Sequence, residues 1–97
     1  MTLGADFAFD VGVTEKHHVR FRWGQWWGLA RITVDGVEVL RERHNWGPPI
    51  RRYEVSVGES EVHSVVIEKD RPFNDIGAGF SKMTFRLFVD GDLVAEY

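Results

Sequence analysis

The chain has 97 residues, a net charge of −3 and no cysteine. These totals predict one domain, exclude disulfides and thiolate chemistry, and argue against nucleic-acid binding driven by net charge alone. No apolar run approaches the ~20 residues of a membrane span. The first residues lack the basic and apolar regions of a signal peptide, so we expect a cytoplasmic protein that does not contact a membrane. The excess of arginine over lysine is typical of a GC-rich, bacterial genome.

Apolar and polar residues alternate with a period of two along nearly the whole chain, and no stretch has helical spacing. Eight strands are predicted, at residues 5–13, 17–23, 27–34, 37–43, 52–57, 61–69, 80–89 and 92–97. Eight short antiparallel strands without a helix must close on themselves or form two sheets. We therefore predict an all-β, antiparallel β-sandwich over residues 1–97, with one four-stranded sheet in each half.

The stretch FRWGQWWGLARITVDG, residues 21–36, holds three of the four tryptophans. A two-residue turn at Gly24 and Gln25 fits a type II′ hairpin, which takes glycine at its first central position. That turn would place Trp23 opposite Trp26, Phe21 opposite Gly28 and Val19 opposite Ala30. Trp23 and Trp26 would then belong to the core, and Trp27 would point outward.

Two further hairpins are marked by Asp-Gly, at Asp35-Gly36 and Asp90-Gly91. Asp-Gly fits a type I′ turn, in which both central residues need a positive φ. The first turn would pair Val34 with Val37 and Ile32 with Val39, all on one face. The second would place Leu87, Val89 and Val94 on one face and Phe88 with Leu93 on the other.

The two halves of the chain share two patterns in the same order. V-G-x-x-E-x-H-x-V starts at Val11 and again at Val57, an offset of 46 residues, and R-x-x-V-D-G-x-x-V starts at Arg31 and again at Arg86, an offset of 55. The added residues fall in the Pro/Gly-rich stretch 70–80. The shared order favours an internal duplication of a four-stranded unit.

One face of the second and third strands gathers the candidate ligand residues, which are Arg20, Arg22, Trp27 and Arg31. One interpretation is a solvated face with an incidental arginine–tryptophan stack. The other is a surface that binds an anion or a partner, including single-stranded nucleic acid with Trp27 as the stacking residue.

The remaining polar groups predict neither a metal site nor a cofactor. His17 and His18 adjoin on one strand and face opposite ways, and His17 and His63 are equivalent in the repeat, which favours a structural role. Glu68, Asp70 and Asp75 could form a carboxylate pair for acid–base work, but nothing in the sequence fixes their separation. Ser60 or Ser64 could form a nucleophile–base pair with His63, but neighbours on one strand point apart, so no such pair is predicted. The run RERH, residues 41–44, is interpreted as a solvated strand end.

Phe21, Gly24, Gly28, Val34, Asp35 and Gly36 form a pattern that resembles the Fas apoptotic inhibitory molecule family. VDGVEVLRE, YEVSVGESEVHSVVIE and GFSKMTFRLFVDG resemble later segments of that family, in the same order. The resemblance implies a non-enzymatic, all-β domain of the β-sandwich type and carries over no catalytic residue. The three clustered tryptophans depart from the family pattern. A bacterial chain would also lack the death-receptor partners of the animal members.

These observations predict a cytoplasmic, non-catalytic binding domain whose partner is another protein or a second copy of itself, since open sheet edges allow a homodimer. An anionic-ligand or single-stranded nucleic-acid binder is the first alternative. An enzyme of unrecognised type is the second.

Overall fold

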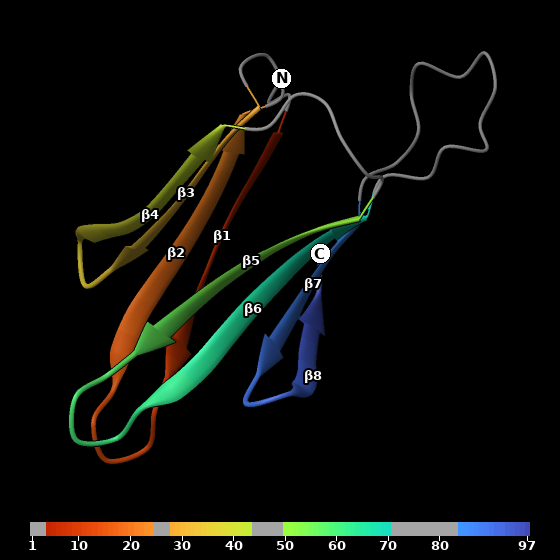
Figure 1. Ribbon diagram of the computed structural model, residues 1–97. Helices are drawn as coiled ribbons and strands as arrows, with labels where there is room; N and C mark the ends of the chain where they lie inside the picture. Colours follow the sequence, from red (N-terminus) through yellow and green to blue (C-terminus); the bar gives the residue numbers. More distant parts are fainter. Residues whose placement is uncertain (1–3, 25–27, 44–49, 71–83) are drawn as a thin grey trace, which may run out of the picture. The chain divides into compact units, whose positions relative to one another are not determined.

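The computed structural model describes residues 4–24, 28–43, 50–70 and 84–97. These residues form two four-stranded antiparallel sheets, with strand orders β1-β2-β3-β4 and β5-β6-β7-β8 (Figure 1). The first sheet consists of β1 (Gly4–Val11), β2 (His17–Gly24), β3 (Leu29–Val34) and β4 (Val37–Arg43). The second consists of β5 (Ile50–Val57), β6 (His63–Asp70), β7 (Thr84–Val89) and β8 (Asp92–Glu96). The predicted all-β fold with one four-stranded sheet per half is confirmed.

The chain divides into two compact units, one of Met1–Gly47 with Val57–His63 and one of Pro48–Ser56 with Ser64–Tyr97. The turn between β5 and β6 therefore groups with the first sheet. Three internal segments lie outside the described residues: 25–27, 44–49 and 71–83. The predictions that fall in these segments concern Trp26, Trp27, the NWGPP loop, the Pro/Gly-rich stretch beyond Asp70, and the start of the predicted strand 80–89. The expectation of a single domain stays a prediction.

Each sheet has one buried face, made by every second residue of its central strands. In the first sheet, Val19, Phe21 and Ile32 are completely buried, and Trp23 is nearly so. In the second sheet, Val65, Ile67 and Leu87 occupy the equivalent positions and are also buried. The residues between them are exposed or half-buried, so the period of two has separated core from surface as alternation requires.

The register between β2 and β3 corrects the predicted two-residue turn at Gly24 and Gln25. Gly24 pairs with Leu29, Trp23 with Ala30 and Phe21 with Ile32. The connection is longer, and the Gly28 amide donates to the Gly24 carbonyl oxygen at 2.8 Å with Gly28 at a φ of 61°. The pairing slips along the strand by an even number of residues. Side chains alternate, so the expected inward and outward faces survive although the expected partners do not.

The Asp-Gly turns form where predicted, but both hairpins contain a β-bulge that the sequence did not reveal. Asp35 and Asp90 have φ values of 51° and 52°, as a type I′ turn requires. The register shifts between Ile32 and Thr33, so Ile32 pairs with Leu40 instead of Val39. It shifts again between Leu87 and Phe88, so Leu87 pairs with Ala95 instead of Val94. The extra residues, Val39 and Val94, are exposed. The bulges bend the outer strands β4 and β8, a common protection of sheet edges.

The internal duplication predicted from the sequence has a structural counterpart in the backbone. Gly12 and Gly58 share a φ of 107°, and the bulges fall at equivalent places in the two hairpins. The Asp35 carboxylate accepts from the His18 amide at 2.8 Å, and the Asp90 carboxylate accepts from the Ser64 amide at 2.9 Å. Each half therefore repeats the same four-stranded design.

Candidate functional site

The exposed face of the first sheet carries three of the four predicted ligand residues. Arg20 and Arg22 lie on β2 and Arg31 on β3, all exposed, whereas Trp27 lies outside the described residues. The predicted two-residue turn also implied that Arg22 faces Trp27 and Arg20 faces Leu29. Both expectations were wrong, because Arg22 pairs with Arg31 and Arg20 with Thr33. Since Arg31 also pairs with Arg41 of β4, three arginines on adjacent strands form a line, which we call the arginine row (Arg22, Arg31 and Arg41).

Arg20 differs from the row because an acidic neighbour already neutralises it. Its Nε and Nη2 donate to the two oxygens of Asp6 at 2.9 and 2.7 Å. This two-pronged hydrogen bond lowers the pKa of Asp6 and raises the pKa of Arg20. Arg20 therefore joins β2 to β1. An anionic ligand could bind Arg20 only by displacing the Asp6 carboxylate.

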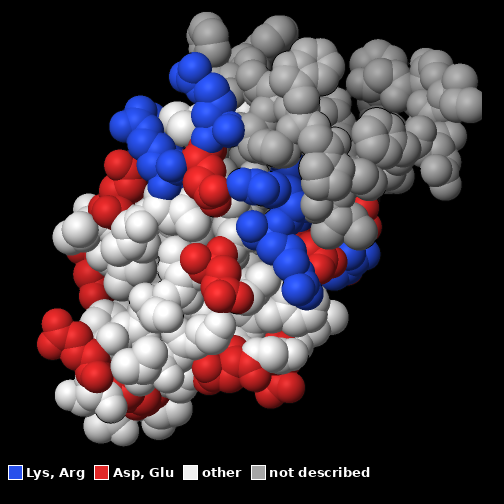
Figure 2. All heavy atoms as spheres, in the orientation of Figure 1, with Lys and Arg blue, Asp and Glu red and all other residues white. Residues whose placement is uncertain are grey.

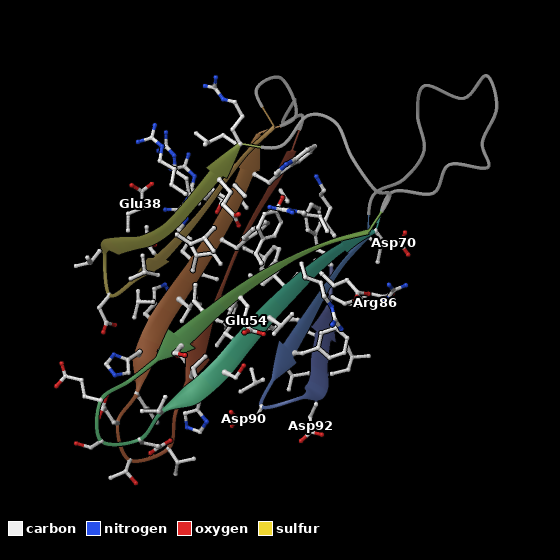
Figure 3. All side chains as sticks on the ribbon, in the orientation of Figure 1. Glu38, Glu54, Asp70, Arg86, Asp90 and Asp92 are labelled. Carbon is white, nitrogen blue, oxygen red and sulfur yellow. The ribbon has the colours of Figure 1, made fainter. Side chains whose placement is uncertain are left out.

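The arginine row has much weaker acidic contacts. Arg22 Nε lies 3.9 Å from the same Asp6, and Arg31 Nε lies 3.8 Å from Glu38. Both distances exceed hydrogen-bond length. Among the described residues, the side chains of Arg41 and its neighbour Arg43 make no ion pair and no hydrogen bond, and their backbones pair with β3. Positive side chains gather over the end of β4, above the side chain of Glu38 (Figures 2 and 3). The row is consequently positive and accessible.

In the second sheet, the positions equivalent to the arginine row and Asp6 carry charges that neutralise one another. The residues that correspond in the repeat to Asp6, Arg22, Arg31 and Arg41 are Arg52, Glu68, Arg86 and Glu96. Their charges alternate. Arg52 Nε donates to Glu68 at 3.1 Å, Arg86 Nη1 to Glu68 at 3.2 Å, and Arg86 Nε to Glu96 at 3.1 Å. We call this set the paired row.

The paired row also answers the question about an acid–base pair near residue 70. Asp70 lies 3.4 Å from Arg86 Nη1, beside Glu68, and Figure 3 labels Asp70 and Arg86. The carboxylates of Asp70, Glu68 and Glu96 raise the pKa of Arg86, which keeps it charged. The carboxylates of Asp70 and Glu68 both bind the Arg86 guanidinium, which favours a structural role over an acid–base role. Asp75 lies outside the described residues.

A second polar cluster joins the first turn (residues 12–16) to the second turn (residues 58–62). A glutamate of each turn accepts hydrogen bonds from the backbone amides of the other turn, and we call this arrangement the carboxylate exchange. Glu61 accepts from the amides of Val13 and Thr14, both at 2.7 Å, and from that of Glu15 at 3.2 Å. Glu15 in return accepts from the amides of Glu59 and Ser60, both at 2.8 Å, and from that of Glu61 at 3.4 Å. Both turns belong to the same compact unit. The sequence signal was the shared V-G-x-x-E-x-H, but nothing in it joined one glutamate to the other turn.

The histidines of the repeat support these glutamates. His17 Nε2 lies 2.5 Å from Glu15, and His63 Nε2 lies 2.5 Å from Glu61. Hydrogen bonds from the histidine and from the backbone amides of the opposite turn lower the pKa of each glutamate to about 2. His17 also places Nδ1 2.5 Å from Asp35. The carboxylates of Asp35 and Glu15 raise the pKa of His17.

This engagement determines what His17 can do chemically. A ring that donates from both nitrogens is protonated, so it has no lone pair with which to bind a metal or accept a proton. His18, on the opposite face, lies 3.0 Å from Asp10, and His44 lies outside the described residues. Within the described ranges, no three His, Asp or Glu side chains are placed to hold a metal ion.

Comparisons with family models, with curated proteins and with solved structures give no match. In the part of the chain that the structure describes, no helix is long and apolar enough to cross a membrane.

Proposed function

We propose that this protein is a non-catalytic binding domain that holds an anionic partner on the arginine row. The supporting observation is the contrast between two equivalent rows of one duplicated design. In one row, Arg86 lies between two glutamates, whereas in the other Arg31 lies between two arginines. Opposed like charges destabilise a sheet, so a row that carries them incurs a cost that a bound anion would relieve.

The non-catalytic part of the proposal is supported by the way candidate acids and bases are engaged. Both ring nitrogens of His17 lie 2.5 Å from a carboxylate oxygen, and Glu68 and Asp70 are held by Arg86. These groups are neutralised by fixed partners, unlike the poised groups of an acid–base site. The resemblance to the Fas apoptotic inhibitory molecule family implies the same kind of role. We therefore also propose that the protein is bacterial and cytoplasmic, and that it is related to the Fas apoptotic inhibitory molecule family.

The row also bears on the identity of the partner. Two copies that met through this face would bring the three arginines of each row together, and this repulsion disfavours a homodimer at this surface. The partner is therefore another molecule. Because the protein as a whole carries a net charge of −3, the attraction of an anionic partner is local to the arginine row. Because the row is exposed, this attraction falls steeply with salt.

Retention on an immobilised polyanion tests the proposal. We expect the wild-type protein to be retained at low salt and Arg41→Gln to elute at lower salt. The matched control is Arg52→Gln, which removes the same charge from an exposed position in the paired row and should elute like the wild type. Absence of retention at low salt, or an equal effect of the two substitutions, would contradict the proposal.

A further inference from the structure

The positive surface of the first sheet is short and bordered by acids. Adjacent strands lie about 4.8 Å apart, so a row over three strands extends over about 10 Å. On the β1 side the row ends at Asp6, which pairs with Arg22. Towards the Asp-Gly turn, the next row contains Arg20, which Asp6 neutralises, and Glu38 opposite Thr33. Along the other direction Arg43 adds one positive charge opposite Leu29.

This shape favours a ligand whose negative charge is equally local. A nucleic-acid strand carries a phosphate at every nucleotide, so a strand that runs along the row towards β1 would continue over Asp6. A protein segment with a few neighbouring carboxylates can place all of them inside the patch and end its charge there. Guanidinium groups match the planar geometry of carboxylates and can bind them with two hydrogen bonds.

The described aromatic residues of the first sheet do not include Trp27, the predicted stacking residue. Binding of single-stranded nucleic acid usually combines positive charge with exposed rings on which the bases stack. On the described part of this sheet, the Phe and Trp side chains lie on the face opposite the row, where they alternate with the exposed residues: Phe7, Phe9, Phe21 and Trp23. The described residues of the arginine face include no Phe, Tyr or Trp.

We infer that the partner of the arginine row is an acidic protein segment, which presents several carboxylates to Arg22, Arg31 and Arg41. This inference rests on the proposed function and specifies its ligand. Exposed ion pairs contribute about 0.2–1 kcal/mol, so each arginine supports affinity by at most about fivefold, and removing all three lowers it by about 3- to 150-fold. Because the contacts are exposed, affinity falls as salt is added.

Fluorescence anisotropy with three labelled probes tests the inference. The probes are a short peptide with about four neighbouring glutamates, the same peptide with glutamines, and a thymidine oligonucleotide of the same net charge. We expect the glutamate peptide to bind more tightly than the oligonucleotide and the glutamine peptide not to bind. We expect the triple variant Arg22→Gln, Arg31→Gln, Arg41→Gln to lose at least about threefold in affinity for the glutamate peptide, and Arg52→Gln to bind it like the wild type.

The outcomes separate the two proposals. Tighter binding of the oligonucleotide, lost in the triple variant, would overturn the acidic-segment inference and leave an anion-binding row. Failure of both anionic probes to bind at low salt would overturn both proposals. Circular dichroism and urea unfolding of each variant verify that a loss of binding does not come from a loss of fold. If the triple variant does not fold, Arg41→Gln alone replaces it, with an expected loss of about two- to fivefold, and an unchanged affinity overturns the inference.

Discussion

Substitution of Gly58 by alanine tests whether the carboxylate exchange depends on the tight conformation of the second turn. Gly58 has a φ of 107°, and a Cβ added there would collide with the Glu61 carbonyl oxygen. Gly91 is the matched control, because its φ is 87° but a Cβ would meet nothing within 4 Å. Both alanines carry the strain of a positive φ, and only the first forces the turn to open.

The magnitudes follow from these two contributions. A positive φ costs an alanine about 1–2 kcal/mol, which is the whole expected loss for Gly91→Ala. Forcing an atom into an occupied position typically adds about 1–3 kcal/mol. Gly58→Ala should therefore lower the free energy of unfolding by about 3 kcal/mol, which for a domain of this size lowers Tm by roughly 15 °C. Displacing the Glu61 backbone also pulls its carboxylate from the amides of Val13 and Thr14.

Urea unfolding followed by tryptophan fluorescence at neutral pH measures both variants. Equal losses for Gly58→Ala and Gly91→Ala would refute the reasoning, because the backbone strain alone would then explain both. Gly12→Ala provides a repeat of the experiment in the other turn, since its Cβ would collide with the Glu15 carbonyl oxygen.

Three further predictions concern charge and packing. The folded pKa of Glu15 and of Glu61 is about 2, below the ordinary 4.5, so their stabilisation is fully present above pH 4.5 and is lost as the pH falls towards 2. Urea unfolding against pH should show that unfolding takes up about two protons in this range, and a double Glu15→Gln, Glu61→Gln variant should lose this dependence. The pKa of His17 is raised, so its stabilisation is fully present below its ordinary pKa and is lost as the pH rises through the raised value. Titration of the ring by NMR should show this raised value, and Asp35→Asn should bring it down; no change would contradict the ion pair. Ile32 is completely buried, so Ile32→Ala should lower the unfolding free energy by about 3 kcal/mol in urea, and a loss below about 1 kcal/mol would place Ile32 outside the core.

The candidate site shows where sequence reasoning reached its limit. Alternation correctly placed Arg20, Arg22 and Arg31 on one exposed face. It could not show that Asp6 neutralises Arg20 or that Arg41 completes the row, because both depend on pairing between strands. The run that contains Arg41 was interpreted as a solvated strand end, and only the register across β3 and β4 connects it to Arg31.

By itself, the sequence determined the strands, the inward and outward faces of the central strands, the Asp-Gly turns and the repeated design. These are local properties, because a period of two and the preference of Asp-Gly for positive φ act over a few residues. The sequence did not determine the faces of β4, because Val37 and Val39, expected on the core face with Ile32, are exposed. Only the tertiary structure decided the register of β2 against β3, the two bulges, and the exchange between Glu15 and Glu61, which are 46 residues apart. A slip by an even number of residues keeps every side chain on its face, so alternation cannot choose among such registers. That choice comes from packing and hydrogen bonds between neighbouring strands, which the alternation within one strand does not encode.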